Sequence, residues 1–108
     1  MNAPTEALVV LVTTPTPERA AEIARAVVEE RLAACGNVVP GLRSIYRWEG
    51  KVQDNPEALL VLKTTRARFE ALRDRVIALH PYQVPEVIAL RVEAGSAAYL
   101  AWIAGETG

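Results

Sequence analysis

The residues of this chain best suited to bind a transition metal or to act as a nucleophile are its single histidine and its single cysteine. His80 stands before Pro81 at the expected end of a helix, where the helix dipole would also favour a simple capping role. An imidazole suits Cu(II) and Zn(II), so His80 is our candidate ligand for a weakly bound divalent metal. Cys35 is expected to be buried and uninvolved, because a free cysteine usually packs as a small apolar side chain.

A second candidate site is the segment from residue 80 to residue 86, which places polar and aromatic groups between two prolines. Ordered connections of this kind often carry binding groups. Tyr82 would provide a wall with a hydroxyl, Glu86 a negative charge, and Lys63, at the end of an apolar stretch, a positive charge. These three residues are therefore predicted to form a ligand cleft. In the alternative interpretation, Lys63 only reaches out to solvent or forms an exposed ion pair with Glu86.

Sequence motifs of common enzymes are missing from the chain. Ser44 and Ser96 lie in no nucleophile-elbow pattern, and there is no glycine-rich phosphate loop and no CxxC or HxxxH pair. The formal net charge of -1 and the pI of about 5.8 give no basic surface for nucleic acid, and no basic tract suggests a membrane. We therefore expect a binding protein that is not an enzyme and has neither nucleic acid nor a membrane as its partner.

The composition is that of one globular domain covering residues 1–108. Hydrophobic residues make up 51% of the chain and charged residues 23%, which is enough apolar surface for a core. A domain of this size buries only part of its apolar surface, so self-association would help it. The single cysteine, and first residues that lack a basic and apolar leader, predict a cytoplasmic location.

The elements that must position these residues follow from the periodicity of the apolar side chains. An unbroken apolar run indicates a strand covered on both faces, and apolar side chains three and four residues apart indicate helices. Gly36 is taken as the stop signal of the first helix. Outside a central hairpin, the expected elements are a strand (Ala7–Thr14), a helix (Pro17–Cys35), a helix ending at His80, a strand (Pro85–Glu93) and a short helix after Ser96.

A long β-hairpin is expected between the two longer helices, over residues 37–63. Its turn lies at Glu49-Gly50-Lys51, where the glycine can adopt a positive φ. Irregularities are expected in both arms, at Pro40-Gly41 and at Asp54-Asn55-Pro56, since proline cannot donate to a strand ladder. The hairpin is therefore predicted to be long and interrupted in both of its strands.

The order strand, helix, strand, strand, helix, strand, followed by a short helix, predicts an α+β fold of the ferredoxin-like βαββαβ type. Right-handed crossovers place the two longer helices on one face of a four-stranded antiparallel sheet and leave the other face bare. A bare apolar sheet face favours self-association. Alternation places Tyr46 and Trp48 on one face of the hairpin, and we expect both residues at the interface between subunits.

Five short motifs, in this order, resemble the CutA divalent-cation tolerance family. The motifs are Glu30–Cys35 (ERLAAC), Ser44–Lys51 (SIYRWEGK), Leu62–Thr64 (LKT), His80–Glu86 (HPYQVPE) and Tyr99–Trp102 (YLAW). The resemblance runs from about Leu8 to Trp102. It implies a cytoplasmic, ferredoxin-like homotrimer, similar in architecture to PII signalling proteins and associated with tolerance to divalent cations, copper above all.

The resemblance also implies a copper site, from which this chain departs. The family's proposed site uses a cysteine near the end of the first strand and a pair of histidines, and the matching residues here are Val12 and Leu79-His80. One imidazole cannot supply the two to four ligands of a tight copper site, so any binding of Cu(II) or another divalent cation is expected to be weak. The alternatives are a PII-like trimeric module that binds a small anionic ligand in clefts between subunits, and a scaffold that presents its trimer to protein partners.

Overall fold

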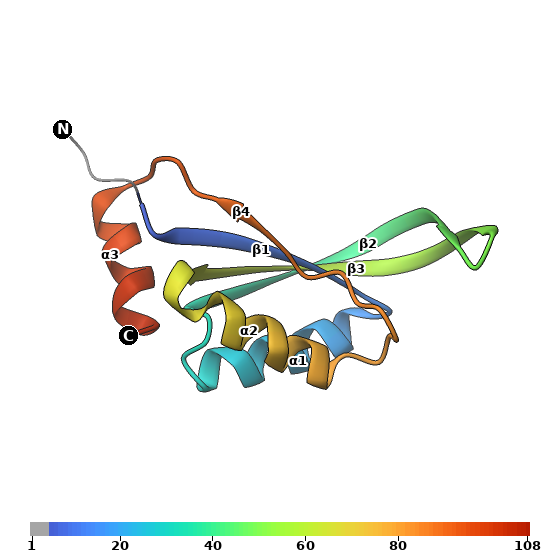
Figure 1. Cartoon of the computed structure of the whole chain (residues 1–108), viewed down its shortest axis with the longest axis horizontal. Helices are drawn as coiled ribbons and strands as arrows, with labels where there is room; N and C mark the ends of the chain where they lie inside the picture. The colour runs from blue at the N-terminus through green and yellow to red at the C-terminus, as the bar shows by residue number, and fades with distance from the viewer. Residues whose placement is uncertain (1–4) are drawn as a thin grey trace.

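The computed structural model describes residues 5–108 and contains, within them, three helices and four strands. In chain order the elements are β1 (Ala7–Thr14), α1 (Pro17–Glu29), β2 (Cys35–Trp48), β3 (Lys51–Thr65), α2 (Arg66–Leu79), β4 (Ile88–Arg91) and α3 (Ala97–Glu106). The strands form one antiparallel sheet in the order β2-β3-β1-β4 (Figure 1). None of the helices in this part of the chain is long and apolar enough to cross a membrane.

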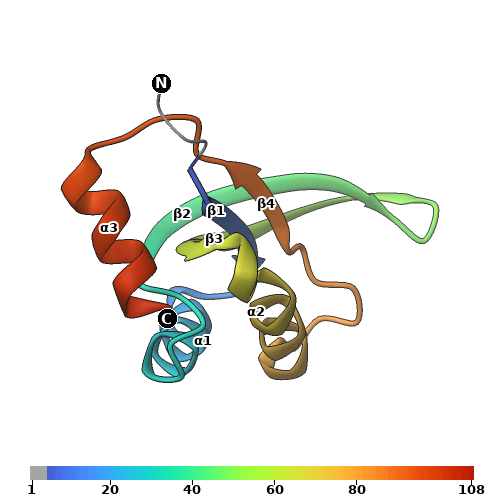
Figure 2. The same ribbon diagram turned by 60° about the vertical axis from the view of Figure 1, so that its left-hand side comes forward.

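Both longer helices cover the same face of the sheet, while α3 lies at the end of the sheet remote from the hairpin tip (Figure 1 and Figure 2). Every second residue of β1, and of β3 from Ala58 onwards, points towards α1 and α2, because successive side chains of a strand alternate between its faces. The predicted α+β, ferredoxin-like fold is therefore confirmed. The centre of the core consists of Val10, Val12, Leu60 and Leu62 from the sheet and Ile23, Val27, Leu72 and Val76 from the helices.

The first helix is shorter than the sequence pattern predicted. It ends at Glu29, and Cys35 is the first residue of β2, where the prediction made it the last residue of the helix. A Schellman motif closes the helix, with the Leu32 N–H donating to the Val27 carbonyl at 2.9 Å. Arg31 takes the left-handed conformation, with a φ of 61°, that glycine usually adopts at this position. The end of α1 could therefore not be recognised in the sequence by the glycine that usually marks it.

Gly36 has a different role from the predicted helix stop. It lies in β2 beneath α1, where an added Cβ atom would come within 2.8 Å of the Ala24 Cβ and 3.1 Å of a Leu62 methyl carbon. No other residue fits there without displacing the helix, because carbon atoms in contact ordinarily stay about 3.5–4.0 Å apart. The absence of a side chain at Gly36 thus sets how closely α1 packs on the sheet.

Beyond their pairing with the rest of the sheet, β2 and β3 continue as a two-stranded arm (Figure 1). The molecule is accordingly elongated, with extents of 49 × 28 × 23 Å. The predicted turn at the tip is confirmed, and Glu49 (φ 50°) and Gly50 (φ 78°) form a two-residue loop between the strands. Positive φ at both positions is the requirement of a type I′ turn, whose twist matches that of a hairpin.

Of the two irregularities predicted in the hairpin, one is present. The ladder shifts register at Pro40-Gly41 in β2. The disturbance predicted at residues 54–56 is wrong, because β3 runs unbroken from Lys51 to Thr65. The last residue of β3 that pairs with β1 is Ala58, so Pro56 faces no ladder on that side and its missing N–H disrupts nothing.

The strand predicted over Pro85–Glu93 is shorter in the structure, where β4 spans only Ile88–Arg91. Its four residues pair with residues 8–11 of β1. The residues before β4 belong to an irregular segment that leaves α2 at its end. α2 stops at Leu79 with His80 as its cap residue, at the position predicted from the following proline.

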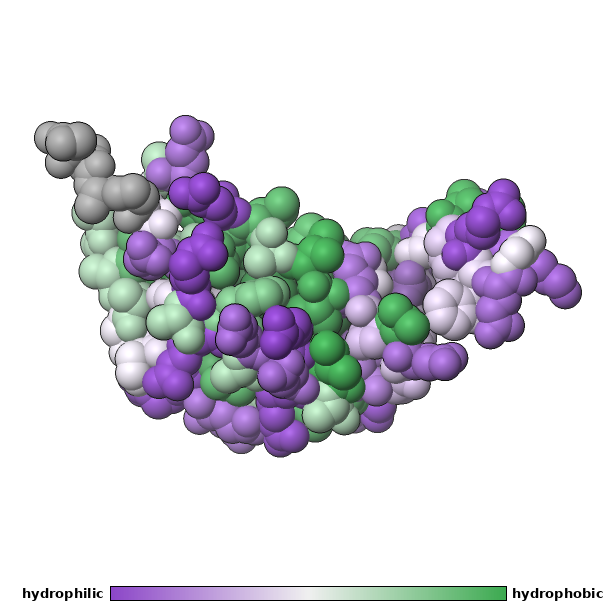
Figure 3. Space-filling model, viewed as in Figure 1, coloured by the Kyte–Doolittle hydropathy of each residue, from purple (hydrophilic) through white to green (hydrophobic). Residues whose placement is uncertain are grey.

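Within residues 5–108, the part of the sheet face opposite α1 and α2 that is formed by β4 and the adjoining strand β1 is apolar and exposed. Ile88 and Leu90 of β4 are 51% and 53% exposed, and they lie beside Leu11 and Val9 of β1 on this face. Figure 3 shows hydrophobic atoms gathered over β4 in the middle of the molecule, between more polar ends. A contiguous apolar surface of this kind is typical of a face that another protein covers.

Candidate functional site

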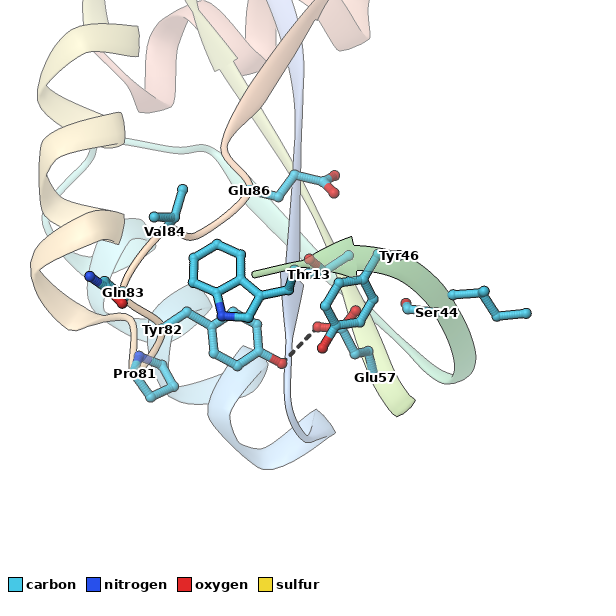
Figure 4. Close-up of a pocket in the computed structure, with 11 residues that line it drawn as sticks. Thr13, Ser44, Tyr46, Glu57, Pro81, Tyr82, Gln83, Val84 and Glu86 are labelled. Carbon is cyan, nitrogen blue, oxygen red and sulfur yellow. Dashed lines mark hydrogen bonds between the residues drawn. The ribbon is translucent and has the colours of Figure 1, made fainter. Parts of the chain in front are cut away.

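A pocket of about 690 Å³ opens where the hairpin arm leaves the sheet, opposite the segment between α2 and β4. Figure 4 shows that side chains from three separate parts of the chain meet there: the arm, the end of β1 and the segment after α2. The lining residues are Thr13, Ser44, Ile45, Tyr46, Trp48, Glu57, Pro81, Tyr82, Gln83, Val84 and Glu86. The pocket therefore exists only when the hairpin and the second crossover are both in place.

The arm contributes polar and aromatic side chains from one of its faces. Tyr46 and Trp48 share a face of β2, as predicted, and Glu57 of β3 lies on that face because it is opposite Leu42. The Asn55 amide donates to the Tyr46 hydroxyl at 2.9 Å and holds the ring in place. Tyr46 and Trp48 are 42% and 40% exposed, so both rings are available to a ligand or to another chain.

His80 supports the opposite wall of the pocket. The side chain is buried, its Nε2–H donates to the Thr13 carbonyl at 2.7 Å, and its Nδ1 accepts from the Tyr82 N–H at 3.1 Å. The imidazole and the Tyr82 ring lie with their centroids 4.7 Å apart. Because both ring nitrogens have partners, a metal ion would have to displace one of these bonds. His80 as a metal ligand stays a prediction, and this geometry does not favour it.

The pocket is electrically negative. The Tyr82 hydroxyl donates to the Glu57 carboxylate at 2.7 Å (Figure 4), and burial together with this bond raises the pKa of that hydroxyl well above its usual range. Burial and the charge of Glu57 also raise the pKa of the Glu86 carboxyl. No lysine or arginine is among the lining residues that the structure describes. A cation in the pocket would relieve the repulsion between the two carboxylates.

The structure separates the three residues predicted to form a cleft. Tyr82 and Glu86 line the pocket, but Lys63 does not. Lys63 stands further along β3, where its ammonium donates to the Asn37 side chain. The charged residue of β3 that lines the pocket is Glu57, which sequence reasoning missed. The sequence does show that Glu57 lies on the same face of the strand as Lys63, because the two residues are an even number of positions apart. Only the hairpin register shows which of the two meets Tyr82.

Cys35 is half-buried at the start of β2, where we expected full burial. It lies beside Lys63 in the ladder, with its Sγ 3.7 Å from the Asn37 side-chain oxygen, and it does not line the pocket. Among residues 5–108 there is no group of three or more His, Cys, Asp or Glu side chains that could hold a metal ion. A tight metal centre is therefore not preformed in this part of the single chain.

Comparison with known proteins gives one consistent family. Residues 8–106 match the family model described as CutA1 divalent ion tolerance protein. A Thermus thermophilus protein named divalent-cation tolerance protein CutA is 56% identical over 100 residues, which is 93% of this chain and 97% of that protein. Human protein CutA is 52% identical over 92 residues, or 85% of this chain and 51% of that protein. The chain thus spans nearly all of the bacterial relative and about half of the human one.

Solved structures agree with the sequence comparison. The divalent cation tolerance protein (Cut A1) from Thermus thermophilus superposes with a TM-score of 0.92 at 55% identity, covering 94% of this chain and 99% of that one. CutA from Xylella fastidiosa superposes with a TM-score of 0.94 at 40% identity, covering 96% and 100% of the two chains. At these identities the likeness covers both the sequence and the fold.

Proposed function

This chain belongs to the CutA1 divalent ion tolerance family, and we propose that it serves divalent-cation tolerance as a cytoplasmic homotrimer that binds cations without catalysing a reaction. The observation that carries the proposal is the charge of the pocket. Its lining includes the carboxylates of Glu57 and Glu86 and, among the described residues, no positive side chain. A small anionic ligand, the alternative drawn from the PII resemblance, would meet repulsion there.

The proposed cation ligands are the carboxylate oxygens of Glu57 and Glu86. Two carboxylates leave most of a coordination shell to water, so binding is expected to be weak and of modest selectivity. Affinity should follow the general order for divalent ions, with Cu(II) bound more tightly than Zn(II) and both more tightly than Mn(II). Protonation competes with the metal, and the raised pKa of Glu86 makes its carboxyl sensitive to mild acid.

Titration calorimetry with copper chloride and zinc chloride tests the proposed site. Glu86→Gln keeps the shape of the side chain and removes one charge, so it should weaken binding of both metals. Glu70→Gln on the exposed surface of α2 is the matched control and should leave binding unchanged. If His80→Gln abolishes binding and Glu86→Gln does not, the sequence prediction of a histidine ligand is right and the carboxylate site is wrong.

The proposed trimer rests on the surfaces that one chain leaves uncovered. The apolar face of the sheet exposes Ile88 and Leu90, and the arm exposes Tyr46 and Trp48. Stable homo-oligomers bury core-like apolar surfaces of roughly 2,000 Å² or more. An interface that joins the bare sheet face of one subunit to the arm of another would cover both surfaces.

Light scattering during size-exclusion chromatography measures the assembly directly. The native protein should elute with three times the chain mass of 11.7 kDa. Ile88→Lys places a charge on the bare sheet face and should dissociate the assembly. Ile77→Lys is the matched control, because Ile77 is similarly exposed (47%, against 51% for Ile88) but lies on α2, away from that face. A monomeric native protein, or equal behaviour of the two variants, contradicts the proposed interface.

A further inference from the structure

Two residues of opposite charge lie far apart on the sheet face opposite α1 and α2. Lys63 stands in the apolar part of this face, where its neighbours across the strands are Val9 of β1 and, beyond it, Leu90 of β4. Glu57 lies on the same face of β3 and lines the pocket at the root of the arm. Their six positions along the strand correspond to about 20 Å, so the two charges cannot meet within one chain.

In the part of the chain that the structure describes, neither charge has a partner of opposite sign. The Lys63 ammonium donates to the neutral side chain of Asn37, and the Glu57 carboxylate accepts from the neutral hydroxyl of Tyr82. None of the ion pairs formed within residues 5–108 involves Lys63 or Glu57. Both residues are half-buried already. Covering this face with another protein surface would remove their remaining water, and an unpaired charge without water is costly.

We propose that the two charges meet between subunits, with the ammonium of Lys63 in one copy of this chain bound to the carboxylate of Glu57 in the next copy. The occupant of this face is then a second copy of the chain, which contributes the missing cation to the pocket. A cyclic trimer is built from such head-to-tail contacts, in which two different surfaces of one chain meet. This inference rests on the proposed homotrimer and adds the contact that fixes how its subunits are placed.

Glu57 is the acid of the arm that can reach the neighbouring sheet. The proposed interface lays the face of the arm that carries Tyr46 and Trp48 on the bare sheet face of another subunit. Among the described strand residues of the arm on this face, Glu57 is the one acid. Asp54 points to the other face of the arm and already pairs with Arg43 at 2.8 Å.

An ammonium from a neighbouring subunit also suits the geometry of the pocket. The Tyr82 hydroxyl donates to one carboxylate oxygen of Glu57 and leaves the other oxygen to a second donor (Figure 4). A hydrogen bond between an ammonium and a carboxylate is stronger than one between neutral groups. The ammonium would reduce the negative charge of the pocket and compete with a metal ion for Glu57, which agrees with the weak metal binding proposed above.

Zero-length cross-linking tests this contact on the assembled native protein. A water-soluble carbodiimide joins an ammonium to a carboxylate only where the two groups touch, and mass spectrometry of the digested protein identifies the joined residues. We expect a link between Lys63 and Glu57 in covalent dimers and trimers. It must run between chains, because about 20 Å separates the two residues within one chain. If the cross-links of the assembled protein lack Lys63, or join it only to other carboxylates, the proposal is wrong.

Charge reversal provides an independent measurement. Lys63→Glu places two carboxylates against each other and should weaken the assembly at least about thirtyfold, measured by light scattering over a dilution series. Arg66→Glu makes the same change of net charge on the exposed surface of α2 and should leave the assembly intact. Adding Glu57→Lys to Lys63→Glu should restore a large part of the lost affinity. Equal effects of Lys63→Glu and Arg66→Glu, or a double variant no better than Lys63→Glu alone, would overturn the proposal.

Calorimetry with copper chloride and zinc chloride separates this inference from the proposed function. A link between Lys63 and Glu57 in a trimer that binds neither metal would contradict the proposed metal site alone. Metal binding by a trimer that lacks this link would contradict the ion pair alone. A monomeric native protein would contradict both the proposed trimer and the contact within it.

Discussion

The close approach between α1 and the sheet predicts the effect of adding one methyl group at Gly36. In Gly36→Ala the new Cβ would lie 2.8 Å from the Ala24 Cβ and 3.1 Å from a methyl carbon of Leu62. Two carbon atoms in contact need about 3.5–4.0 Å, so the helix has to move by about 1 Å. The Ala24 methyl is fixed to the helix backbone and cannot rotate away.

The expected loss of stability follows from two opposing effects. Overpacking a closely packed core costs about 1–3 kcal/mol. Replacing glycine by alanine also restricts the unfolded chain, which returns about 0.4–1 kcal/mol. The net destabilisation should be about 1–2 kcal/mol, which for a domain of this size lowers the melting temperature by roughly 4–8 °C.

Differential scanning calorimetry or thermal circular dichroism measures this change. Gly105→Ala is the matched control, because the residue is in α3 and its added Cβ would meet no atom within 4 Å outside the adjoining helix backbone. The same substitution should there stabilise the protein, by up to about 1 kcal/mol, since alanine favours a helix more than glycine does. The reasoning is refuted if Gly36→Ala is neutral, or if adding Ala24→Gly to it produces a strictly additive change in place of a partial rescue.

Three further predictions concern other contacts. Glu86→Gln should stabilise the protein at neutral pH by at most about 1 kcal/mol, because a raised pKa means that the ionised carboxylate disfavours the folded state. In thermal unfolding measured over a pH series, this gain should disappear below about pH 4, where the carboxyl is protonated in both the folded and the unfolded state. Glu49→Asn should raise the melting temperature by a few degrees, since Asn tolerates a positive φ better than Glu, and an unchanged value would speak against a strained turn. Arg68→Ala should cost about 1–2 kcal/mol in urea unfolding, because Arg68 Nε donates to the Thr107 carbonyl at 2.6 Å, and the exposed Arg66→Ala serves as the comparison.

The fold could be predicted from the sequence because its elements carry strong local periodicity. The unbroken apolar run of β1 and the apolar stripe of α2 were sufficient to place both elements. The end of α1 could not be predicted, since Arg31 adopts the left-handed conformation without the glycine that normally marks it. The prediction that Gly36 stops the helix was wrong for a different reason. Gly36 makes a close tertiary contact with Ala24, which the local sequence does not encode.

The lining of the pocket was predictable for residues that are close together in the sequence, and was not predictable for residues whose position depends on strand register. Tyr82 and Glu86 belong to one short segment, and their placement together needs no tertiary information. Lys63 and Glu57 share a face of β3, and which of them meets Tyr82 depends on where the hairpin leaves the sheet. The charged residues that line the pocket are therefore both acidic, whereas the predicted cleft combined the positive charge of Lys63 with the negative charge of Glu86.

The two-stranded arm gives β3 unequal protection along its length. From residue 58 to residue 65 its backbone is bonded to β1 on one side and to β2 on the other over most of its length, but from residue 51 to residue 57 it is bonded to β2 alone. An isolated two-stranded hairpin is only marginally stable in water, so the outer amides should exchange with deuterium far faster than the inner ones in a free chain. Slow exchange at the tip would then report contact with a neighbouring subunit, because in residues 5–108 the strands of the tip pair only with each other.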